Sequence, residues 1–134
     1  MTAYVDSSAL LKRYLDEPDS AVGQHLLDID PVLATSWITH VEVRRNLSRA
    51  LSGSTLRSAQ AQFARDFDSL AVVACDATVA HAAAEISENL GVRSLDAIHL
   101  ATAKRLLIDD LAFITFDLRQ GQAARSLGLR VYGC

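Results

Sequence analysis

Residues 3–10, Ala-Tyr-Val-Asp-Ser-Ser-Ala-Leu, place a short apolar run directly before an acid, two serines and a second apolar segment. The first run predicts a strand that ends at Asp6. Ser7 and Ser8 are candidates to cap a helix that would extend over residues 9–15. The stretch therefore predicts a strand, a helix and an acidic side chain at the junction between them.

Short apolar runs alternate with helical patterns along the rest of the chain. Strands are expected near Tyr4 and at residues 32–34, 71–74, 112–116 and 130–132. Helices are expected at residues 9–15, 37–51, 56–67, 79–90, 94–107 and 119–127. This alternation predicts an α/β fold with a central parallel sheet of four to five strands flanked by helices. The strands are continuous apolar runs, which is typical of a sheet covered on both faces in a three-layer arrangement.

Length and composition favour one globular unit. The chain has 134 residues, of which 50% are hydrophobic and 22% are charged, so a single domain over residues 1–134 is expected. The net charge of −3 provides no bulk attraction to nucleic acid, and any polyanion would have to bind a local basic patch.

The sequence shows neither a cysteine framework nor a membrane-targeting segment. Cys75 and Cys134 are the only cysteines, which excludes a disulfide framework and a zinc-binding spacing. The chain begins without a basic segment, and no apolar run approaches the roughly 20 residues of a membrane span. We therefore expect a cytoplasmic protein that does not bind a membrane.

Four acids lie in apolar surroundings, where lone carboxylates are unusual. They are Asp6, Glu42 within Val-Glu-Val, Asp96 within Leu-Asp-Ala-Ile, and Asp117 after an expected strand. Each also has an ordinary explanation. Asp6 could cap a helix, Asp96 could complement a helix dipole, and Asp117 could begin a turn. Glu42 could pair with Arg45 or Asn46 on its own helix.

The joint placement of these acids favours a shared cation. Asp6 and Asp117 would follow parallel strands at the same edge of the sheet, and Asp96 opens a helix that leads toward the second of those strands. Oxygen ligands without a histidine or cysteine partner favour Mg²⁺ or Mn²⁺. Such a site suits hydrolysis of a phosphodiester.

Other polar residues have weaker claims to a role. His99 could contact the acids, but its position favours a histidine packed inside a helix layer, and His25, His40 and His81 show no ligand spacing. Ser8 lacks the surroundings of a catalytic serine, and Thr115 could orient a carboxylate. Basic residues near the expected site could hold an RNA backbone: Lys12, Arg13, Arg44, Arg45, Arg49, Arg93 and Arg119. The absence of a glycine-rich phosphate loop excludes nucleotide-dependent chemistry.

Four segments together resemble a PIN domain of the VapC toxin family. They are residues 4–10 (Tyr-Val-Asp-Ser-Ser-Ala-Leu), 39–42 (Thr-His-Val-Glu), 93–101 (Arg-Ser-Leu-Asp-Ala-Ile-His-Leu-Ala) and 115–117 (Thr-Phe-Asp). The segment at 93–101 is the most specific, and the likeness extends over essentially the whole chain.

This resemblance implies a PIN-like fold and a metal-dependent endoribonuclease that acts as the toxin of a toxin–antitoxin pair. It also implies homodimerisation, an RNA substrate and neutralisation by a small VapB-type antitoxin. By the same resemblance, Asp6 and Asp96 would be direct ligands of Mg²⁺ or Mn²⁺, and Glu42 and Asp117 would bind or orient metal and water. Ser8 and Thr115 match supporting positions.

Two other functions are compatible with small α/β domains that carry acids at the sheet edge. A receiver-type signalling module would need an adjacent acidic pair after the first strand and a phosphoacceptor after the third, a role that only Asp76 could take. A non-catalytic interaction domain would use the four acids only to stabilise the fold.

Overall fold

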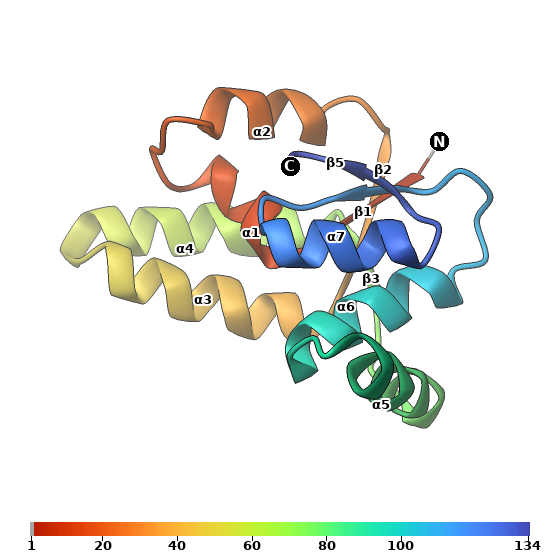
Figure 1. Ribbon diagram of the computed structural model, residues 1–134. Helices are drawn as coiled ribbons and strands as arrows, with labels where there is room; N and C mark the ends of the chain where they lie inside the picture. The colour runs from red at the N-terminus through yellow and green to blue at the C-terminus, as the bar shows by residue number, and fades with distance from the viewer. Residues whose placement is uncertain (1) are drawn as a thin grey trace.

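The computed structural model describes residues 2–134 and contains a five-stranded, fully parallel sheet. The strands are β1 (Thr2–Val5), β2 (Val32–Ser36), β3 (Ala71–Val73), β4 (Ala112–Ile114) and β5 (Arg130–Tyr132). Their order across the sheet is β3-β2-β1-β4-β5, so the first strand is central (Figure 1). The predicted α/β class and parallel sheet are confirmed, and each expected strand is present within two residues of its predicted ends.

Within residues 2–134, seven α-helices connect and cover these strands. They are α1 (Ser7–Leu10, continued by the 3-10 turn η1, Leu11–Arg13), α2 (Ser20–Leu27), α3 (Ile38–Ala50), α4 (Gly53–Asp68), α5 (Ala77–Leu90), α6 (Ser94–Arg105) and α7 (Leu118–Ser126). The helix α2 was not predicted. Asp6 and the two serines were both candidates to cap α1, and it is the carboxylate of Asp6 that accepts from the N–H of Ala9.

The central strand alternates its side chains between two apolar layers. Tyr4 stacks on Phe113 of β4 with ring centroids 5.3 Å apart, on the face covered by α6 and α7. Ala3 and Val5 point to the opposite face, where they pack in one cluster with Leu27 of α2. Figure 1 shows this arrangement, with α2 on one side of the sheet and α6 and α7 on the other. The burial of both faces explains why the strands are apolar throughout.

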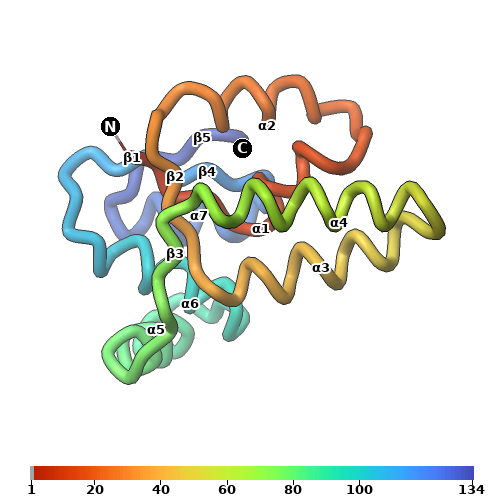
Figure 2. The backbone as a smooth tube through the Cα atoms, turned by 180° about the vertical axis from the view of Figure 1, so that it is seen from behind, coloured from red at the N-terminus to blue at the C-terminus, as the bar shows by residue number. Residues whose placement is uncertain are grey.

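The helices α3 and α4 form a pair that extends beyond the sheet (Figure 2). Their contact is a core of Val43, Leu47, Phe63 and Phe67, which Leu10 of α1 joins. Because α3 follows β2 directly, its first turns, which include Glu42, begin near the carboxyl end of that strand. Within the part of the chain that the structure describes, no helix combines the length and apolar character needed to cross a bilayer.

Candidate metal centre and groove

The strand order reverses at β1, and this reversal determines where a site can form. The chain adds β2 and β3 on one side of β1 and then crosses over to add β4 and β5 on the other side. In parallel sheets such a reversal opens a crevice at the carboxyl ends of the two strands concerned. Asp6 follows β1 and Asp117 follows β4, and the Asp6 N–H donates to the Ile114 carbonyl at 3.2 Å. The topology therefore brings the ends of these two segments together.

Asp6 follows β1 directly and is buried, with only 3% of its surface exposed. Its Oδ1 accepts hydrogen bonds from the Ser8 hydroxyl at 2.7 Å and from the Ala9 N–H at 3.1 Å, and its Oδ2 accepts from the Thr115 hydroxyl at 2.5 Å. Burial raises the pKa of Asp6 even though each of these bonds favours the ionised form. A neighbouring cation would offset the cost of burying this charge.

Ser8 and Thr115 tie the loop after β4 to Asp6. The Ser8 hydroxyl accepts from the Phe116 N–H at 2.9 Å, and the Thr115 hydroxyl accepts from the Asp117 N–H at 3.1 Å. The two hydroxyl oxygens lie 3.2 Å apart. Ser8 and Thr115 therefore hold the Asp6 carboxylate and the backbone of residues 116 and 117 in one hydrogen-bond network.

Glu42 turns away from its own helix. Its Oε1 lies 2.7 Å from Nε2 of His99 on α6, whereas the Asn46 side chain bonds only to the Glu42 backbone carbonyl. The alternative explanation, in which the Glu42 carboxylate pairs with Arg45 or Asn46, is therefore not supported. The other ring nitrogen of His99 lies 2.7 Å from the Tyr4 hydroxyl. A buried hydrogen-bond chain thus connects the central strand to Glu42.

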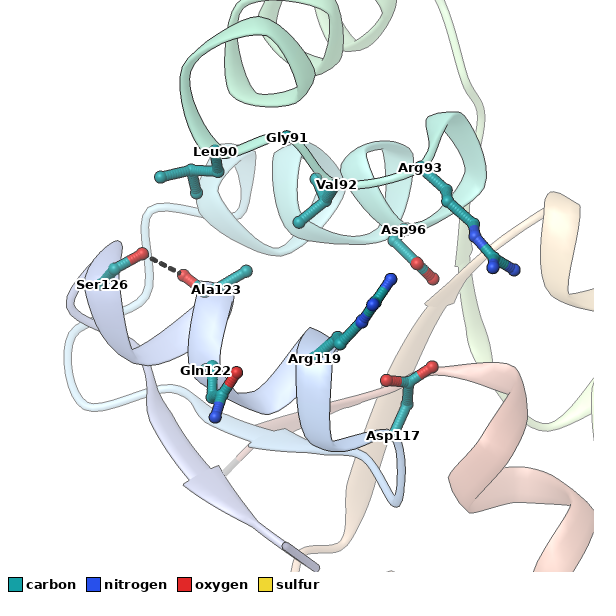
Figure 3. Close-up of a pocket in the computed structure, with 10 residues that line it drawn as sticks. All are labelled: Leu90, Gly91, Val92, Arg93, Asp96, Asp117, Arg119, Gln122, Ala123 and Ser126. Atoms are coloured by element: carbon teal, nitrogen blue, oxygen red, sulfur yellow. Dashed lines mark hydrogen bonds between the residues drawn. The ribbon is translucent and has the colours of Figure 1, made fainter.

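Asp96 and Asp117 face each other across the space between α6 and α7 (Figure 3). Asp96 lies in the first turn of α6, and Asp117 caps α7 by accepting from the Gln120 N–H at 3.1 Å. Burial raises the pKa of Asp96, and the negative charges of Asp117, Asp6 and Glu42 raise it further. The other three predicted acids therefore act electrostatically on Asp96.

The carboxylates gather without forming a closed cage. Among residues 2–134, no three side chains of the His, Cys, Asp and Glu types are positioned to hold a metal ion on their own. Mg²⁺ does not require such a cage, because it keeps several waters and is usually bound through one or two carboxylates together with substrate phosphate. The all-oxygen donor set, the buried charge of Asp6 and the mutual repulsion felt by Asp96 fit a hard divalent cation of this kind.

A groove of about 710 Å³ extends from the two facing carboxylates (Figure 3). Asp96 and Asp117 line one end together with Arg93 and Arg119, and Figure 3 shows Arg119 pointing from α7 into the space beside the acids. The remaining wall combines apolar and polar side chains: Leu90, Val92, Gln122, Ala123 and Ser126. Neither arginine side chain forms an ion pair or hydrogen bond within residues 2–134, so both guanidinium groups remain available to a ligand.

The receiver-type alternative is not supported by the position of Asp76. This residue follows β3, an edge strand, and its carboxylate caps α5 through the Val79 N–H at 3.0 Å. The same carboxylate oxygen pairs with Arg105 at 3.1 Å. Asp76 is therefore a structural cap at a distance from the point where the strand order reverses.

The role of His99 was missed by sequence reasoning, which favoured a histidine engaged only in packing. It is buried as expected, with 1% of its surface exposed, yet both of its nitrogens bond to polar side chains. The available signal was its spacing from Asp96, since residues three apart lie on the same side of a helix. Its partner Glu42 is 57 positions away, and no local pattern reveals that contact.

Residues 3–126 match the PIN domain family. Ribonuclease VapC46 of Mycobacterium tuberculosis is 35% identical over 128 residues, which cover 96% of this chain and 94% of that protein. The crystal structure of FitAcB from Neisseria gonorrhoeae superposes with a TM-score of 0.76 at 20% identity, over 98% of this chain and 96% of the other. The DNA-bound VapBC structure from Salmonella typhimurium gives a TM-score of 0.70 at 18% identity, with all of both chains covered.

The structural matches agree with the observed fold. The structural neighbours share the three-layer arrangement, and the sequence match extends over nearly the whole length of a curated relative. The chain therefore belongs to the PIN domain family and, within it, to the family of the VapC ribonucleases.

Proposed function

We propose that this protein is a metal-dependent endoribonuclease and the toxin of a VapBC-type toxin–antitoxin pair. The observation that carries the proposal is the buried Asp6, held by Ser8 and Thr115 at the reversal of the strand order, with Asp96 electrostatically coupled to it. Membership of the VapC family supports the choice of RNA as the substrate.

The four acids would have different roles in metal binding. Asp6 and Asp96 would hold Mg²⁺ or Mn²⁺ directly, and Glu42 and Asp117 would bind or orient the metal and water. When bound, the cation supplies positive charge that offsets the phosphate and favours deprotonation of water. Ser8 and Thr115 keep Asp6 in place, so that the charged group need not reorganise during the reaction.

The groove supplies the basic patch that a protein with a net charge of −3 needs in order to bind RNA. Arg93 and Arg119 lie beside the acids and would contact phosphates of a single strand. The apolar wall formed by Val92 and Ala123 would accept a base or ribose. A single-stranded segment suits this shape, because unpaired bases can turn into a groove.

We also propose that the protein pairs with a small VapB-type antitoxin, forms a homodimer and acts in the cytoplasm. A neighbouring solved structure contains a VapBC assembly, which supports the antitoxin. Light scattering of the purified toxin would measure its mass directly. Co-expression with the product of an adjoining small reading frame should give a stable complex in which RNA cleavage is suppressed.

The proposed reaction is tested by RNA cleavage with purified protein. We expect cleavage with Mg²⁺ or Mn²⁺, none with EDTA, and products with a 5′-phosphate and a 3′-hydroxyl. The double variant Asp6→Asn, Asp96→Asn should lose more than about 100-fold in rate, beyond the range typical of residues that only support a ligand. Asp76→Asn is the matched control, because Asp76 caps a helix in the same way but lies outside the site.

Cleavage by the double variant at the rate of the native protein would exclude the proposed site. Cyclic phosphate products formed in EDTA would indicate metal-free chemistry instead. If the metal raises the melting temperature but no RNA is cut, the alternative of a non-catalytic interaction domain is favoured.

A further inference from the structure

His99 forms the middle of a buried chain that connects three elements. Its Nδ1 lies 2.7 Å from the hydroxyl of Tyr4 on β1, and its Nε2 lies 2.7 Å from Oε1 of Glu42 on α3. Tyr4 and His99 are both inaccessible to solvent, with 0% and 1% of their surfaces exposed. The Glu42 side chain retains 19% exposure, so the chain begins in the core and ends at the edge of the site.

The chemistry of the three groups determines which nitrogen carries the proton. An ionised carboxylate can only accept, so Nε2 of His99 must donate to Glu42. In the neutral ring Nδ1 is then an acceptor, and the Tyr4 hydroxyl must donate to it. A phenolic hydroxyl carries its proton at neutral pH, so Tyr4 can donate to Nδ1 at the observed 2.7 Å. Tyr4 therefore selects the form of the ring that can hold Glu42.

The contact with His99 uses only one oxygen of Glu42. Within the described residues, 2–134, Oε2 of Glu42 has no hydrogen-bond partner. A glutamate side chain has several rotatable bonds and therefore needs a partner to hold it in one position. The neighbouring α3 residues Arg44 and Arg45 are exposed to solvent and do not supply one. The bond from His99 holds Glu42 toward α6, on the same side of α6 as Asp96.

We propose that His99, held by Tyr4, is a positioning residue that fixes the Glu42 carboxylate for binding a divalent cation beside Asp96. The inference rests on the proposed metal-dependent function. It assigns a role to a histidine that would otherwise only fill space between β1 and α6. Residues that hold a metal-binding group in place typically contribute about 10- to 100-fold to affinity.

The test measures Mn²⁺ binding without RNA, by electron paramagnetic resonance of the free ion. We expect His99→Leu to weaken binding about 10- to 100-fold. Tyr4→Phe keeps the ring that stacks on Phe113 and removes only the hydroxyl, so it should weaken binding in the same direction but less. Tyr14→Phe is the matched control, because its hydroxyl bonds to Asp66 at 2.6 Å on the α4 side of the molecule.

A double-mutant cycle separates positioning from packing. If His99 acts through Glu42, then His99→Leu should change Mn²⁺ affinity by less than about twofold in a Glu42→Gln background. A merely structural histidine would give the same loss in both backgrounds, and that result would overturn the inference. Native Mn²⁺ affinity in both Tyr4→Phe and His99→Leu would overturn it too.

The Mn²⁺-binding measurements also distinguish this inference from the proposed function. A native protein that binds Mn²⁺ but cuts no RNA would refute the proposed function, while the affinities of the variants would still decide the role of His99. A native protein that does not bind Mn²⁺ would refute both. If His99→Leu does not fold, as judged by circular dichroism, Tyr4→Phe alone and in the Glu42→Gln background provides the same comparison.

Discussion

The Asp6 carboxylate that we propose as a cation ligand also caps a helix. Its Oδ1 caps α1 through the Ala9 N–H, and its Oδ2 is held by Thr115. Asp117 likewise caps α7 through one oxygen. A carboxylate offers about four acceptor positions, so capping a helix and binding a cation are compatible roles. Asp6 and Asp117 therefore do cap helices, and this capping is compatible with the proposed binding of a cation.

The raised pKa values of Asp6 and Asp96 predict how stability responds to pH without metal. Because the folded state binds these protons more tightly than the unfolded state, their contribution is fully present below about pH 4. It is lost as the pH rises through the raised folded values. Asp96→Asn cannot ionise, so its melting temperature relative to the native protein should increase from pH 4 to pH 7 in EDTA.

Differential scanning calorimetry between pH 4 and pH 7 measures whether the melting-temperature difference between Asp96→Asn and the native protein increases with pH. Asp76→Asn, measured in parallel, should not show the same increase. A difference between Asp96→Asn and the native protein that stays constant with pH would contradict the assignment of the shift to Asp96.

At the scale of elements, the short segment between α5 and α6 determines where α6 begins and therefore where Asp96 lies. The helix α5 ends at Leu90, and Gly91 follows in the left-handed conformation with φ of 68°, its N–H donating to the Ser87 carbonyl at 2.9 Å. The helix α6 begins three residues after Gly91, at Ser94, with Asp96 in its first turn. The predicted end of the helix at Gly91 is confirmed, and the glycine permits the sharp turn between two closely packed helices.

Gly91→Ala should lower the free energy of unfolding by about 1–2 kcal/mol, the usual cost of placing a side chain in the left-handed region. An added Cβ would meet no atom within 4 Å, so the loss comes from the backbone alone. Gly91→Asn should cost less, because asparagine adopts this conformation more readily. Urea denaturation of the three proteins measures the order, and equal stability of Gly91→Ala and the native protein would contradict the explanation.

For the whole molecule, charge distribution matters more than net charge. The total of −3 opposes RNA binding, yet Arg93 and Arg119 lie in the groove beside the acids. RNA affinity should therefore depend on a few local contacts and weaken with salt. This arrangement limits binding to strands that lie along the groove.

Arg119→Gln should weaken RNA binding and reduce the slope of log affinity against log salt by about 0.7, the value for one phosphate contact with a single strand. Binding is measured by fluorescence anisotropy in EDTA, so that no cleavage occurs. Arg57→Gln on α4 is the control, because that helix belongs to the pair that extends beyond the sheet (Figure 2). An unchanged slope for Arg119→Gln would show that the groove does not hold the strand.

Much of the fold follows from local patterns, and the exception has a tertiary cause. The five strands are apolar runs, so their positions could be predicted from the sequence, as could those of most helices. The helix α2 was missed because its sequence shows no clear apolar stripe. The preceding loop is held by Lys12, which is 7% exposed and pairs with Glu17 and Asp19 at 3.0 and 2.7 Å. Such contacts leave no periodic signal in the sequence.

By itself, the sequence determined the alternation of strands and helices, the positions of the four acids within it, and the family. Those features depend on near neighbours and on the apolar character that burial requires. Only the tertiary structure decided that Glu42 contacts His99 and not Arg45, that Tyr4 supports that contact, and that Arg93 and Arg119 line one groove. Side-chain partners across elements depend on packing angles and rotamers, which sequence spacing does not specify.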